Sequence, residues 1–152
     1  MENLIIEETK YTPSIKLNVQ NRTIELIGKS YPENTFEFYK PMMDWIESYF
    51  NNNEDKDETT TVNVEIIYFN SSSSKLFFDF FDLIEEAHNK GKSIEVLWVY
   101  DEENESALEA GEDFKEDFED INFTLVKKSL FICLSNCEEL LGGYSRELIG
   151  CR

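Results

Sequence analysis

The sequence has few of the residues that enzymes and metal proteins most often use at their sites. Its 152 residues include one histidine and three cysteines, and Cys133, Cys137 and Cys151 all lie close to the C-terminus. Because their spacing matches no zinc or iron–sulfur pattern, we expect reduced thiols, no metal and no cofactor. One histidine cannot supply a nucleophile–base pair with these late cysteines, and carboxylate pairs such as Glu85-Glu86 have no converging partner. A binding protein is therefore favoured over an enzyme.

Positive charge is also scarce. The chain has 14 Lys and Arg against 32 Asp and Glu, which gives a formal net charge of −18. Such a surface repels nucleic-acid backbones and anionic lipid, so we expect neither nucleic acid nor membrane as a partner. Proteins with basic patches suit it better. No N-terminal signal and no membrane-length apolar run is visible, which predicts a cytoplasmic protein.

The rest of the chain alternates between strand and helix patterns. Period-two alternation and short apolar runs predict strands at 4–8, 15–19, 24–26, 62–69, 94–100 and 123–126. Helical spacing predicts three helices: 36–50 after an Asn34 cap, the serine run to Gly91, and Asn104 to Phe118. Gly28 is expected to end the first hairpin, and 51–60 is expected to be a polar loop. This order predicts an α/β fold, a mixed β-sheet with helices packed against it through right-handed crossovers.

The stretch of residues 68–75 (YFNSSSSK) lies where a predicted strand ends and a predicted helix begins. The backbone N–H groups at a helix start favour a hydroxyl cap and also tolerate an anion. A phosphate there would meet the positive end of the helix dipole and would add nearly two negative charges. We interpret this junction as a regulated phosphorylation site. The alternative is that the serines only cap the helix.

The helix after the serines carries more phenylalanine than one face requires. Its core stripe is Leu76, Phe77, Phe80, Leu83, Ile84 and Ala87. Phe81 lies at the flank of this stripe, and Phe78 points away from it toward solvent. An outward aromatic near the serines is typical of a contact surface, unless the C-terminal tail or a second copy covers it. The predicted partner-binding residues are Asn70, Ser72, Ser73, Lys75, Phe78 and Phe81.

Several segments together resemble the SiaC family of bacterial regulatory phosphoproteins. These segments are Thr12-Pro13, 30–34 (SYPEN), 68–75, 83–88 (LIEEAH) and 98–101 (WVYD). The resemblance covers residues 1 to about 127 and implies a fold similar to the STAS, or anti-anti-sigma, domain. We expect one SiaC-like domain over 1–128, followed by a C-terminal extension over 129–152 whose role is unknown.

The resemblance also implies a partner-switching circuit. In that family a GHKL-like kinase phosphorylates the hydroxyl residue after the strand's Asn, and a PPM-type phosphatase removes the phosphate. The unphosphorylated form binds and activates a diguanylate cyclase, which raises cyclic di-GMP and favours biofilm. The phosphosite carries over to Ser71, where the family commonly has Thr, with Ser72 as runner-up. The alternative is a constitutive STAS-like adaptor that binds an anti-sigma kinase or a sensor protein, with Ser71 only a helix cap.

Overall fold

The computed structural model describes residues 1–52 and 58–128, which form six strands and three helices. The strands are β1 (Leu4–Ile6), β2 (Ser14–Asn18), β3 (Thr23–Ser30), β4 (Thr60–Phe69), β5 (Ile94–Asp101) and β6 (Asn122–Lys128). The helices are α1 (Thr35–Asn52), α2 (Ser71–Asn89) and α3 (Glu105–Asp117). The extension expected over 129–152 lies outside the described residues. None of the described helices is long and apolar enough to span a membrane.

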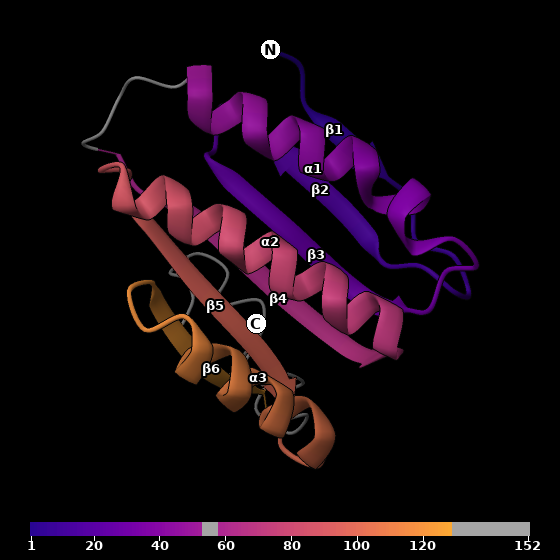
Figure 1. The fold of residues 1–152 in the computed structure, drawn as a ribbon. Helices are drawn as coiled ribbons and strands as arrows, with labels where there is room; N and C mark the ends of the chain where they lie inside the picture. Colours follow the sequence, from indigo (N-terminus) through magenta and orange to yellow (C-terminus); the bar gives the residue numbers. More distant parts are fainter. Residues whose placement is uncertain (53–57, 129–152) are drawn as a thin grey trace, which may run out of the picture.

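The six strands lie in the sheet in the same order as in the chain. The pairs β1–β2 and β2–β3 are antiparallel, and β3–β4, β4–β5 and β5–β6 are parallel. Each parallel pair is joined by one helix, and Figure 1 shows α1, α2 and α3 on the same face of the sheet. The mixed α/β architecture predicted from the sequence is confirmed.

The core lies between the sheet and the three helices, because alternate strand residues point to that face. Trp98 of β5 is fully buried there, and its indole N–H donates to the Ala107 carbonyl of α3 at 2.9 Å. Helix α3 approaches β5 so closely that a Cβ on Gly111 would lie 2.5 Å from the Trp98 ring. Glycine at this position therefore lets α3 pack directly on Trp98.

Several element boundaries differ from the sequence prediction, and the largest differences are at the end of β3 and the start of β4. The antiparallel pairing of the hairpin ends at Ile27, next to Gly28 as predicted, but β3 itself continues to Ser30 along β4, because the φ of +133° at Gly28 accommodates a register shift beside Lys29. β4 begins earlier than predicted, at Thr60, whose N–H donates to the Ser93 carbonyl at 2.9 Å. Of the loop predicted over 51–60, residues 53–57 lie outside the described part of the chain.

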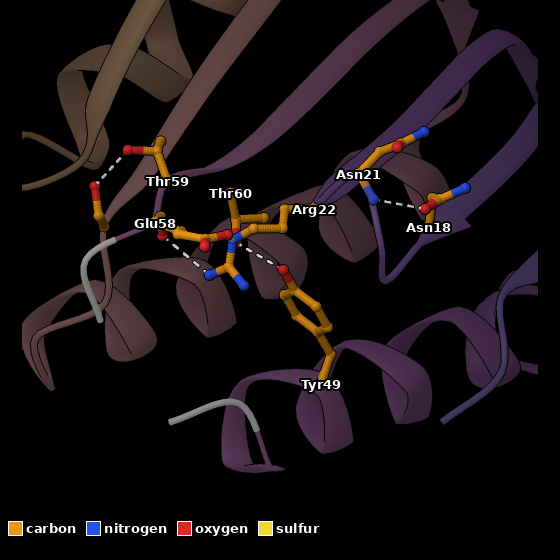
Figure 2. Close-up of polar contacts among 8 residues, drawn as sticks. Asn18, Asn21, Arg22, Tyr49, Glu58, Thr59 and Thr60 are labelled. Carbon is orange, nitrogen blue, oxygen red and sulfur yellow. Dashed lines mark hydrogen bonds and ion pairs between the residues drawn. The ribbon is translucent and has the colours of Figure 1, made fainter. Parts of the chain in front are cut away.

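Polar contacts close the end of the parallel strands at which β4 and β5 begin (Figure 2). The Tyr49 and Thr60 hydroxyls lie 2.9 Å apart in a buried pair that joins α1 to β4. Arg22 donates to the Glu58 carbonyl at 2.9 Å, and its side chain lies 3.6 Å from the Glu58 carboxylate. These contacts connect α1, β4 and the neighbouring loops at this end of the sheet. The serine junction lies at the opposite end of the strands.

Candidate functional site

The junction between β4 and α2 is capped by an asparagine and not by a serine. The Asn70 side-chain oxygen accepts from the Ser73 N–H at 2.9 Å, and the Asn70 carbonyl accepts from the Ser74 N–H at 2.9 Å. This finding counts against the alternative interpretation, in which the serines only cap the helix. Asparagine is an equally good N-cap, so the cap needs no serine. The Ser71 hydroxyl is exposed and has no hydrogen-bond partner among the described residues.

The four serines differ because successive helix residues point in directions 100° apart. Ser71 and Ser72 are exposed, Ser74 is half-buried, and Ser73 is fully buried. The Ser73 hydroxyl donates to the Ser30 carbonyl at 3.0 Å and lies 2.7 Å from the Ser30 hydroxyl. The prediction that Ser73 contacts a partner is therefore wrong, because its side chain ties the start of α2 to the end of β3.

A third hydroxyl extends this buried contact. Tyr39 of α1 lies with its phenol oxygen 2.6 Å from the Ser30 hydroxyl. Burial raises the pKa of the Tyr39 phenol, and the Ser30 hydrogen bond opposes that rise only in part. Tyr39 thus stays neutral and can donate to Ser30, Ser30 can donate to Ser73, and Ser73 donates to the Ser30 carbonyl. Sequence analysis missed this chain, since its members are far apart in sequence.

A groove of about 660 Å³ lies between α2 and α3, beside the serines. We call it the α2–α3 groove. It is lined by Phe69, Ser71, Ser74, Lys75, Phe78, Asp79, Ser106, Glu109, Ala110, Asp113, Phe114 and Asp117. Ser71, Lys75 and Phe78, which the sequence singled out, therefore meet in one groove, whereas Ser72 is not among its lining residues.

The two phenylalanines predicted to contact a partner have different positions. Phe78 is 46% exposed, and its ring centroid lies 5.0 Å from that of Phe118. Its outward orientation was predicted correctly. Phe81 is fully buried, with its ring centroid 5.0 Å from Phe114 and 5.3 Å from Phe123. The prediction that Phe81 contacts a partner is wrong, because α3 and β6 close over the flank of the α2 stripe.

The two walls of the groove differ in charge: the α2 wall carries an ion pair, and the α3 wall carries only carboxylates. On α2, Lys75 is largely exposed and its ammonium lies 3.8 Å from the Asp79 carboxylate. On α3, Glu109, Asp113 and Asp117 recur every fourth residue and so lie along one side of the helix. Sequence analysis missed this wall, since an acidic helix face looks like an ordinary solvated surface. Among the described residues, no three His, Cys, Asp or Glu side chains are placed to hold a metal ion.

Comparison with known proteins gives consistent matches. The model of the family described as SiaC family regulatory phosphoprotein matches residues 6–128. An uncharacterised protein of Pseudomonas aeruginosa strain UCBPP-PA14 is 36% identical over 117 residues, which cover 77% of this chain and 90% of that protein. The solved structure of SiaC of Pseudomonas aeruginosa superposes with a TM-score of 0.73 at 31% identity, over 85% of this chain and 99% of that one.

A second solved structure holds the same relative with a partner. In the crystal structure of the diguanylate cyclase SiaD in complex with its activator SiaC from Pseudomonas aeruginosa, the matched chain superposes with a TM-score of 0.71. It is 33% identical, and the match covers 83% of this chain and 98% of that one. Family model, sequence relative and superposed structures agree over the described domain, and the chain belongs to the SiaC family of regulatory phosphoproteins.

Proposed function

We propose that this chain is a non-catalytic phosphoprotein in which phosphorylation of Ser71 switches its binding to a diguanylate cyclase. The observation that carries the proposal is the position of Ser71. Its hydroxyl is exposed, is not used in capping α2, and lines the same groove as the half-exposed Phe78. A kinase can reach this hydroxyl without opening the fold. Ser72 stays the runner-up, since it is exposed but does not line the groove.

The start of α2 suits a phosphate. A dianion on Ser71 would lie at the positive end of the helix dipole, which favours it by roughly 0.3–1 kcal/mol. Lys75, one turn along α2 and largely exposed, is placed to turn from Asp79 toward that dianion. A partner packed over Ser71 and Phe78 would have to desolvate the dianion and would lose affinity. Phosphorylation is thus expected to block an interface without unfolding the domain.

The proposed partners are those that the family resemblance implies. The relative SiaC is named as the activator of the diguanylate cyclase SiaD in the solved complex. By analogy we propose a diguanylate cyclase as the target of the unphosphorylated form, with effects on cyclic di-GMP and biofilm. A GHKL-like kinase and a PPM-type phosphatase are proposed to set the phosphorylation state in the cytoplasm. The alternative, a constitutive adaptor in which Ser71 only caps α2, has less support because Asn70 is the cap.

Intact-mass analysis tests the site. We expect the purified chain to gain one phosphate when it is incubated with its GHKL-like kinase and ATP. Ser71→Ala should abolish the gain, while Ser72→Ala, a matched change one residue along the helix, should leave it intact. Full modification of the Ser71→Ala variant together with loss in Ser72→Ala would move the site to Ser72. A mass unchanged in the parent chain would refute the phosphorylation switch.

A further inference from the structure

We infer that the α2–α3 groove receives an amphipathic segment of the partner protein, with an apolar side chain packed on Phe78 and Lys or Arg side chains facing α3. The inference rests on the proposed function, because it takes the partner to bind over Ser71. It adds the chemistry of the partner's contact segment and its orientation in the groove. Neither follows from the position of the phosphosite alone.

The apolar half of the inference comes from Phe78. An aromatic ring that is 46% exposed leaves a large area of apolar surface in water. The rest of that ring packs on Phe118, and the groove around it is lined by Phe69, Ala110 and Phe114. An apolar side chain of the partner would bury the exposed part of Phe78 against these residues. Buried aromatic contacts of this kind commonly carry most of an interface's binding energy.

The basic half of the inference comes from the α3 wall. The groove lining holds four carboxylates, those of Asp79, Glu109, Asp113 and Asp117, against the single ammonium of Lys75. Lys75 lies beside Asp79, so the α3 carboxylates have no cation of the lining near them. They are spaced about 6 Å apart along the helix. Lys or Arg residues in the partner segment would complement this row, and such contacts mainly raise the association rate.

The orientation follows from the switch itself. A partner cation over Ser71 would attract the phosphate dianion, and phosphorylation would then strengthen binding. Blocking by phosphorylation therefore requires that the uncharged side of the segment covers Ser71 and Phe78. Its cations must lie against Glu109 and Asp113 on the opposite wall. The partner segment is thus apolar on one side and basic on the other.

Two double variants of α3 test the inference in the full chain. Glu109→Gln with Asp113→Asn removes two of the three carboxylates of the α3 wall, and Glu112→Gln with Glu116→Gln removes the same charge from exposed positions outside the groove lining. Each diguanylate cyclase of the chain's own organism is immobilised in turn. The dissociation constant of each variant is measured in about 50 mM and about 300 mM salt, because salt screens the charge contacts that only the groove variant is expected to lose. We expect the groove variant to bind at least about threefold more weakly in low salt and to depend less on salt. The outer variant should bind like the parent.

The outcomes separate the inference from the proposed function. Equal weakening in both double variants, or no weakening in either, would overturn the inference. Tighter binding after phosphorylation of Ser71 would overturn the orientation. If phosphorylation still weakens binding while the groove charges have no effect, the inference fails and the proposed switch stands. If the parent chain binds no cyclase at either salt concentration, the proposed partner itself is wrong. Thermal melts of both variants check that neither change unfolds the domain.

Discussion

Replacement of Ser73 by alanine is expected to lower the free energy of unfolding by about 2 kcal/mol. The Ser73 hydroxyl makes two buried contacts, to the Ser30 carbonyl at 3.0 Å and to the Ser30 hydroxyl at 2.7 Å. The Ser30 carbonyl would keep its bond from the Asn70 N–H at 3.1 Å, so it would not be left alone. The Ser30 hydroxyl would lose the group to which it donates. A buried donor without an acceptor costs about 1–3 kcal/mol, which sets the estimate.

Chemical denaturation and thermal melts measure this effect. For a domain of this size, a loss of about 2 kcal/mol lowers the melting temperature by roughly 4–8 °C. Ser72→Ala is the matched control, because it makes the same change in helix propensity at an exposed neighbour and should stay within about 0.5 kcal/mol of the parent. The double variant Ser30→Ala/Ser73→Ala should cost less than the sum of its two parts, because both changes disrupt one hydrogen-bonded chain.

Kinase assays complete the test of Ser73. The Ser73→Ala variant should still accept one phosphate, because its Ser71 hydroxyl is unchanged. The reasoning is refuted if Ser73→Ala is as stable as Ser72→Ala. That result would mean that the buried chain of hydroxyls does not fasten α2 to β3.

Three further predictions concern the switch and the core. Phosphorylation of Ser71 should leave the melting temperature unchanged or raised, while affinity for the cyclase falls at least about tenfold, or ~1.4 kcal/mol. A large fall in melting temperature would mean that phosphorylation acts by unfolding α2 instead. Phe78→Ala should weaken capture of the cyclase with little effect on stability, whereas Phe80→Ala, at a fully buried position, should lower the free energy of unfolding by roughly 3–5 kcal/mol. Equal losses of unfolding free energy in the two variants would contradict the outward placement of Phe78. Because burial raises the pKa of Tyr39, its contribution to stability is fully present below the unfolded pKa of about 10 and is lost as the pH rises above it. Denaturation at about pH 9 and about pH 11 should therefore show a smaller pH-dependent loss in Tyr39→Phe than in the parent.

The sequence alone predicted features that depend on a single element and its neighbours. Periodicity predicted the strands and helices, and the predicted Asn34 cap is confirmed by the bond that its side-chain oxygen accepts from the Glu37 N–H at 3.0 Å. The outward direction of Phe78 also needed only the helical angle. These features follow from local rules, so they could be predicted without knowing how the helices pack.

Features that depend on two distant elements could not be predicted in this way. The burial of Phe81 depends on how α3 and β6 pack over α2, which the α2 sequence does not encode. Ser73 is buried because Ser30, 43 residues earlier in the chain, ends β3 beside it. The acidic wall of the groove has the pattern of a solvated helix face, and only its position opposite Ser71 gives it a role.

The sequential strand order determines when the α2–α3 groove can form during synthesis of the chain. From β2 onward, every strand pairs with the strand made just before it, so no strand has to wait for one that is made later. During synthesis, β4 and α2 can pack on β3 and α1 as soon as they leave the ribosome. The second wall needs α3, which follows some tens of residues later, on the order of a few seconds at ~5–20 residues per second. Ser71 is therefore exposed on the nascent chain before the groove that would recognise a cyclase is complete.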